Sequence, residues 1–98
     1  MYLIREVFQA KPGRAKDLVK MFKQAKPHFE KMGMASNMKV MTDIVSKYWT
    51  VVVESETDDI GAFFGNMRSA TMTDELKEIM KGYMDNVEGG RREIFMIE

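Results

Sequence analysis

Hydrophobic and polar residues recur along this chain with two different periods, which divide it into predicted strands and helices. Residues 2–8 read YLIREVF, a run rich in β-branched and aromatic types that leads into the turn sequence KPG. Between residues 15 and 32 the apolar positions instead recur at steps of three and four. The first pattern predicts a strand and the second predicts an amphipathic helix.

Two residues modify the predicted helix. Pro27 lies inside the helical pattern, where a proline removes one backbone hydrogen bond at a cost of about 3 kcal/mol or more. We therefore expect a kink or two helical pieces. Gly33 is expected to end the helix.

The middle of the chain predicts a β-hairpin. Residues 38–44 alternate between apolar and polar types, and residues 48–54 read YWTVVVE. Alternation with a period of two is typical of strands. The two runs are joined by the short connection 45–47.

The last third predicts a helical region and a final strand. Residues 55–59, SETDD, suit a helix N-terminus. Helical spacing of apolar residues follows, is interrupted at residues 69–73, and resumes after Asp74. The pair Gly89 and Gly90 is expected to end the helical region, and residues 92–97 alternate as a strand.

The predicted order β-α-β-β-α-β indicates an α+β, ferredoxin-like fold, with one antiparallel sheet carrying both helices on one face. We expect a single domain over residues 1–98. The first and third strands should be central, and neither face of residues 48–54 is polar enough to suit water. The face without helices therefore predicts a face-to-face homodimer.

Composition excludes several classes of function. Fifteen basic and fifteen acidic residues leave no net charge to attract nucleic acid or an anionic membrane. Without cysteine, and with His28 as the one histidine, we expect no metal site and no disulfide. No apolar run approaches the roughly 20 residues of a membrane span, and no signal sequence is recognised, so a cytoplasmic location is expected.

The chain resembles the dimeric α/β-barrel superfamily, especially its NIPSNAP-like and antibiotic-biosynthesis-monooxygenase-like members. The resemblance covers nearly the whole chain, and its most recognisable parts are the opening YLIREVFQAKPG before a helix and the segment VESETD before the next helix. It implies the barrel fold, whose members include cofactor-independent monooxygenases, haem-degrading enzymes and lactone isomerases. Such a fold alone does not determine the activity.

One activity of that superfamily is disfavoured. The haem-degrading members use an asparagine, a tryptophan and a histidine, and at the matching positions this chain has Glu6, Phe63 or Phe64, and Thr73 or Asp74. The histidine that would bind iron is missing there. No cofactor is therefore expected.

Glu6 is the main candidate for chemistry. It shares a predicted strand face with Tyr2, Ile4 and Phe8, where an unpaired buried carboxylate would cost several kcal/mol. Glu6 is then either a general base or ligand anchor in a pocket, or one half of a structural pair with an arginine such as Arg92. Arg5, on the opposite face, is expected to form a structural ion pair at the dimer interface.

The leading hypothesis is a cytoplasmic homodimer that binds a small apolar molecule between sheet and helices. Its expected ligand-binding residues are Glu6, Phe8, Phe63, Phe64 and Met67. One alternative is a cofactor-independent monooxygenase or isomerase with Glu6 as proton acceptor. Another is a structural or interaction domain without a ligand. Trp49 is interpreted as a core or interface anchor on its strand.

Overall fold

A computed structural model describes residues 1–33, 36–69 and 73–98, and it confirms the α+β, ferredoxin-like class. The order of elements is that of the predicted pattern, with the second helical region divided into parts. In chain order the elements are β1 (Tyr2–Ala10), α1 (Ala15–Lys31), β2 (Ser36–Thr42), β3 (Thr50–Thr57), α2 (Ile60–Ser69), α3 (Asp74–Met80), the 3-10 helix η1 (Tyr83–Asn86) and β4 (Val87–Met96).

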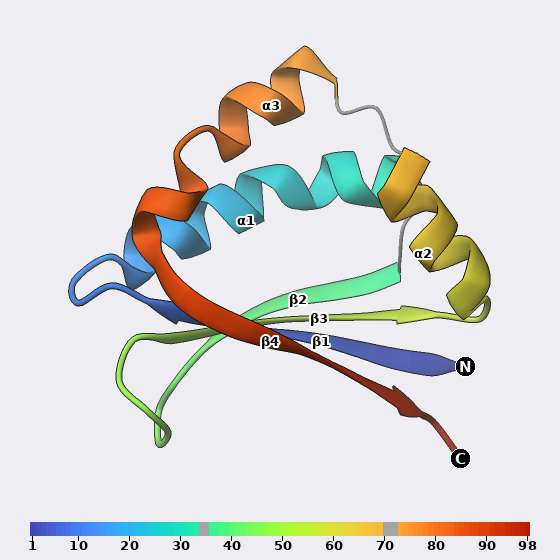
Figure 1. The fold of residues 1–98 in the computed structure, drawn as a ribbon, viewed down its shortest axis with the longest axis horizontal. Coiled ribbons are helices and arrows are strands. Elements are labelled where there is room, and N and C mark those ends of the chain that lie inside the picture. The colour runs from blue at the N-terminus through green and yellow to red at the C-terminus, as the bar shows by residue number, and fades with distance from the viewer. Residues whose placement is uncertain (34–35, 70–72) are drawn as a thin grey trace.

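The strands form one antiparallel four-stranded sheet in the order β2-β3-β1-β4. β1 and β3 are therefore central, as predicted. The helices lie on one side of this sheet, and the loop between β2 and β3 bends toward the other side (Figure 1). We call these two sides the helical face and the open face. None of the helices in the described ranges has the length and hydrophobicity of a membrane span.

The core lies between α1 and the middle of the sheet. Leu18 and Phe22 of α1 are buried against Val51 and Val53 of β3. Phe8 of β1 joins them, with its ring centroid 4.9 Å from that of Phe22. Burying one such side chain stabilises the fold by roughly 1.5–3 kcal/mol. This packing fixes which residues of β1 face the helices.

Of the two alternatives expected at Pro27, a kink or two helical pieces, the division into two pieces is wrong. α1 continues through Pro27 to Lys31. Pro27 is exposed, so its ring lies away from the core and the cost is confined to the helix backbone. Gly33 follows the end of the helix with φ +68° and donates its backbone N–H to the Glu30 carbonyl oxygen at 3.1 Å, as expected for a helix stop.

The predicted hairpin is wrong at its turn. β3 begins at Thr50, so Tyr48 and Trp49 belong to the loop 43–49 and not to a strand. The carboxylate of Asp43 accepts the Thr50 backbone N–H at 3.1 Å, and the Thr50 hydroxyl donates to the Lys47 carbonyl oxygen at 2.6 Å. These contacts close a longer loop in which Trp49 has φ +64°.

The pair Gly89 and Gly90 does not end the helical region, because both glycines lie inside β4. Gly90 is opposite Phe8, and a Cβ atom there would overlap the carbonyl oxygen of Val7. Glycine at this position allows β4 to approach β1 closely.

The interruption of the second helical region, expected at residues 69–73, agrees with the bounds of the two helices. α2 ends at Ser69 and α3 begins at Asp74, and residues 70–72 lie outside the described ranges.

Candidate functional site

Glu6 lies on the helical face, as the alternation of β1 predicts. Its neighbours on that face are Ile4, which is buried, and Phe8, which packs on α1. Arg92 is directly opposite Glu6 in the pairing of β1 with β4. The strand register therefore brings a carboxylate and a guanidinium together.

Glu6 and Arg92 form an ion pair, with Arg92 Nε donating to Glu6 Oε1. The side chains are 25% exposed for Glu6 and 35% for Arg92, so the pair is partly screened by solvent. The pairing of Glu6 with Arg92 that the sequence suggested is therefore present. Proton transfer by Glu6 would require this pair to open.

Aromatic residues of α2 extend the site. The guanidinium carbon of Arg92 lies 5.9 Å from the centroid of the Phe63 ring, within the range of a cation–π contact. Phe63 in turn meets Phe64 edge to face, with centroids 5.5 Å apart and an interplanar angle of 72°. Arg92 therefore links Glu6 to two of the aromatic residues predicted from the sequence.

A cavity of about 330 Å³ borders the ion pair, and we call it the Glu6–Arg92 cavity. It lies between the first half of β4 and η1. Its lining includes Phe8, Tyr83, Met84, Val87 and the two glycines of β4. The lining is largely apolar, and its polar side chains are those of the ion pair, Tyr83 and Arg91.

The cavity brings together only some of the predicted residues. Glu6 and Phe8 line it, whereas Phe63, Phe64 and Met67 do not. Phe63 is buried beside Arg92, and Met67 is 37% exposed on α2. Sequence reasoning missed Tyr83, Met84 and Val87 because η1, a 3-10 helix, follows a left-handed Gly82 with φ +78° and has no helical periodicity to reveal it.

Two larger hollows lie elsewhere on the helical side. One, of about 1040 Å³, runs between α1 and α3 beside His28, and its charges of both signs include Arg14 and Asp17. The other, of about 480 Å³, lies under Tyr48 and Trp49 against the first turns of α1. Neither contains the Glu6 pair, and the larger one is a broad groove lined by exposed helix side chains. We therefore take the smaller Glu6–Arg92 cavity as the candidate site.

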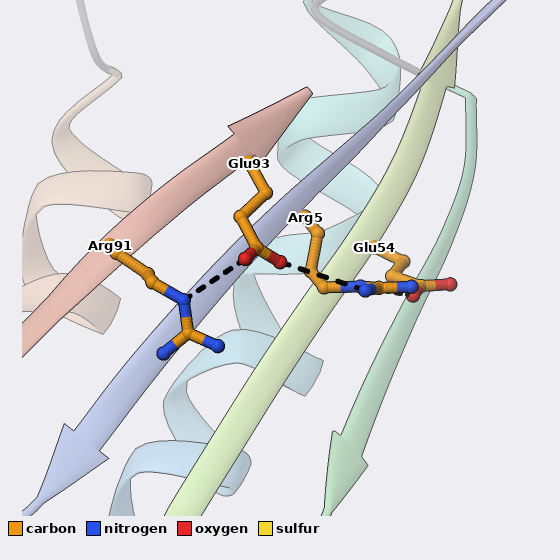
Figure 2. A network of polar contacts seen from close by, with 4 residues as sticks. All are labelled: Arg5, Glu54, Arg91 and Glu93. Atoms are coloured by element: carbon orange, nitrogen blue, oxygen red, sulfur yellow. Dashed lines mark hydrogen bonds and ion pairs between the residues drawn. The ribbon is translucent and has the colours of Figure 1, made fainter. Parts of the chain in front are cut away.

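Arg5 belongs to a separate ion network on the open face (Figure 2). Its Nε atom lies 2.8 Å from Glu54 Oε2, and its Nη1 atom lies 3.6 Å from Glu93 Oε1. Glu93 also pairs with Arg91 at 3.1 Å. The structural ion pair expected for Arg5 is confirmed, and it links three strands.

Neither a family model nor a curated protein matches this sequence. Solved structures do match its fold. A NIPSNAP family protein from Agrobacterium tumefaciens is 6% identical with a TM-score of 0.79, over 99% of this chain and 92% of that one. A NIPSNAP domain protein from Burkholderia xenovorans is 10% identical with a TM-score of 0.73, over 100% and 95%.

A third similar structure is an antibiotic biosynthesis monooxygenase, 11% identical with a TM-score of 0.72, covering 100% of this chain and 99% of that one. At identities this low, the structural match demonstrates a shared fold, and it carries no information about a shared activity. The resemblance found in the sequence is therefore confirmed at the level of the fold: this chain has the ferredoxin-like fold of NIPSNAP and antibiotic-biosynthesis-monooxygenase-like proteins.

Proposed function

We propose that this chain is a cytoplasmic homodimer that binds a small, largely apolar molecule in the Glu6–Arg92 cavity. The observation that carries the proposal is the ion pair at the border of a largely apolar cavity. Ligand pockets typically combine apolar walls with a few polar groups that orient the ligand. A volume of about 330 Å³ is at the lower end of such pockets, so the ligand should be small.

The polar groups define the chemistry of the ligand. Arg92 can pair with a carboxylate or another anionic group, and Glu6 can accept a hydrogen bond from a hydroxyl or amine. The Tyr83 hydroxyl has no hydrogen-bond partner within the described residues and can donate or accept. A ring or short chain with one polar end fits this arrangement.

The open face supports the homodimer. It carries apolar residues such as Val7 and Val52 beside the ion network of Arg5, and no helix of the described ranges covers it (Figure 1). A 98-residue domain also buries a modest share of its surface on its own. Light scattering at micromolar concentration should therefore give the mass of two chains, and the mass of one chain would contradict the dimer.

An enzyme is the second candidate, because one structural neighbour is an antibiotic biosynthesis monooxygenase. In that case this chain would be a cofactor-independent monooxygenase or isomerase in which Glu6 accepts a proton from the bound molecule. Glu6 would first have to leave Arg92. A ligand anion that takes Glu6's place on Arg92 would free the carboxylate for this role.

The binding proposal is tested with anilinonaphthalene sulfonate, an apolar aromatic anion whose fluorescence rises on binding. Arg92→Gln should weaken dye binding by about tenfold, because the anion loses its charged partner. Glu6→Gln should keep or tighten binding. Arg14→Gln, in the groove between α1 and α3, is the matched control. Equal losses in the two arginine variants would contradict the assigned site.

Native mass spectrometry of the purified protein should then identify any molecule that is bound. If the parent protein converts that molecule, Glu6→Gln should fold normally and lose turnover. A molecule that is bound and unchanged over hours would support the binding protein and exclude the enzyme.

A further inference from the structure

Trp49 has an unusual backbone conformation beside a second pocket of the helical side. Its φ is +64°, an outlier for a bulky residue, because the Cβ atom then crowds a backbone carbonyl oxygen. The residue is nevertheless 42% exposed, so burial in the core does not account for this conformation. Strained residues of this kind cluster at ligand sites, where the surrounding structure maintains them.

Hydrogen bonds fix the backbone around Trp49. Its carbonyl oxygen accepts the Ala10 backbone N–H at 2.9 Å. The next residue, Thr50, donates its backbone N–H to the Asp43 carboxylate at 3.1 Å and its hydroxyl to the Lys47 carbonyl oxygen at 2.6 Å. The backbone that carries the indole is therefore in place before a ligand arrives, which lowers the ordering cost of binding.

The pocket beside Trp49 has a volume of about 480 Å³, and we call it the Trp49 pocket. Ligand pockets typically have volumes of about 300–1,000 Å³. The lining includes Ala15, Lys16 and Val19 of α1, and Asp43, Tyr48 and Trp49 of the loop 43–49. The Glu6–Arg92 cavity has none of these residues in its lining, so the two pockets are separate.

Aromatic and aliphatic side chains dominate the Trp49 pocket. Tyr48 and Trp49 provide aromatic rings, and Ala15 and Val19 of α1 provide aliphatic groups. An aromatic ring gains offset-stacked or edge-to-face contacts with such side chains in addition to the burial of its apolar area. The walls of the pocket therefore favour a ligand with an aromatic ring.

Lys16 and Asp43 determine the charge of that ligand. Asp43 is half-buried, and its carboxylate already accepts the Thr50 backbone N–H. Lys16 is exposed and forms no ion pair with another residue of the described ranges. The unpaired charge at the pocket is thus the Lys16 ammonium, which attracts a carboxylate.

From these observations we infer that the Trp49 pocket binds a small aromatic carboxylate, with its ring against Trp49 and its carboxylate at Lys16. An aliphatic acid lacks the ring contact, and an aromatic amine is repelled by the Lys16 ammonium. This second site does not depend on the Glu6–Arg92 cavity, so either proposal can fail without the other.

Fluorescence tests the site directly, because Trp49 is the one tryptophan of the chain. The probe is para-nitrobenzoate, an aromatic acid whose nitro group quenches indole emission on contact. Quenching should saturate, and the lifetime of the remaining emission should stay constant, because the unquenched molecules have no probe bound. The neutral para-nitrobenzyl alcohol should bind about threefold more weakly. A lifetime that falls in step with the intensity would indicate random collisions and overturn the inference.

Two lysine variants test the charge pair. Lys23 is also exposed on α1 and lies outside the pocket, which makes Lys23→Gln the matched control. Lys16→Gln should raise the dissociation constant of para-nitrobenzoate about threefold and leave that of the alcohol unchanged. Lys23→Gln should change neither constant. Equal effects of the two substitutions would overturn the role of Lys16.

Arg92→Gln distinguishes this pocket from the Glu6–Arg92 cavity. It should leave the quenching of Trp49 unchanged, because Arg92 does not line the Trp49 pocket. A loss of quenching in this variant would place the probe in the other cavity and overturn the second site. Since anilinonaphthalene sulfonate is also an aromatic anion, its binding to the Glu6–Arg92 cavity is then measured in the Lys16→Gln background.

The indole N–H resonance of Trp49 gives a measurement that does not depend on quenching. Benzoate, which has no nitro group, should shift this single resonance in the parent protein and in Arg92→Gln. Half of the shift should need about threefold more benzoate in Lys16→Gln. A resonance that does not move as benzoate is added would overturn the inference, and the proposed ligand of the Glu6–Arg92 cavity would be unaffected.

Discussion

Arg5 and Glu6 are neighbours in β1, yet their ion pairs have different surroundings. Glu6 pairs with Arg92 on the helical face, where Phe63 and a cavity are the next neighbours. Arg5 pairs with Glu54 and Glu93 on the open face (Figure 2), which no helix of the described ranges covers (Figure 1). Under the proposed function, the first pair contributes to ligand binding and the second to the contact between two copies. The surroundings of each pair, more than its charges, distinguish the two roles.

Gly89 and Gly90 give the largest expected effect. They are neighbours in β4 and point to opposite faces of the sheet, as Arg5 and Glu6 do in β1. A Cβ atom on Gly90 would overlap the Val7 carbonyl oxygen, whereas one on Gly89 would meet nothing within 4 Å. Gly90→Ala should therefore destabilise the fold by about 2–3 kcal/mol. Gly89→Ala should change the free energy of unfolding by less than about 0.5 kcal/mol.

Urea unfolding at one fixed protein concentration measures both variants. The fixed concentration matters because dimerisation makes the midpoint concentration-dependent. Similar losses for the two alanine variants would mean that β4 does not approach β1 as closely at Gly90 as the structure shows.

The two arginines give the next effect in size. Arg5→Gln should raise the dissociation constant of the dimer by roughly tenfold, because Glu54 and Glu93 would be brought under a second copy with one cation fewer. Arg92→Gln should change it less than about twofold, since Arg92 lies on the other face. Sedimentation of both variants measures the difference. An equal effect of the two substitutions would contradict the separation of the faces.

The sequence was sufficient to predict which face each residue of β1 occupies. Alternation in residues 2–8 placed Glu6 with Ile4 and Phe8, and it placed Arg5 on the opposite face. It also suggested Arg92 as the partner of Glu6. These predictions succeeded because a strand period of two leaves no freedom once one apolar face is buried.

The misplaced elements have local physical causes. Tyr48 and Trp49 are strong strand formers, but Asp43 and Gln9 bind the backbone of the loop and hold Trp49 in a left-handed conformation. Gly89 and Gly90 resemble a turn, but close approach of β1 and β4 keeps them extended. The cavity lining was missed for a related reason, because η1 is too short to show a period.

The smallest effect concerns the loop on the open face. The Gln9 side chain donates to the Tyr48 carbonyl oxygen at 2.6 Å, and the Ala10 backbone N–H donates to the Trp49 carbonyl oxygen at 2.9 Å. A left-handed tryptophan costs about 1–2 kcal/mol, so these bonds must hold it. Gln9→Ala should destabilise the protein by about 1 kcal/mol and speed amide exchange in the loop 43–49.

Gln24→Ala, on an exposed position of α1, is the matched control. It should leave loop exchange unchanged and alter stability by less than about 0.5 kcal/mol, because alanine is at least as good a helix former as glutamine. Hydrogen exchange followed by mass spectrometry measures both variants. If the loop exchanges at the same rate in Gln9→Ala as in the parent protein, then the Gln9 side chain does not hold the loop in place.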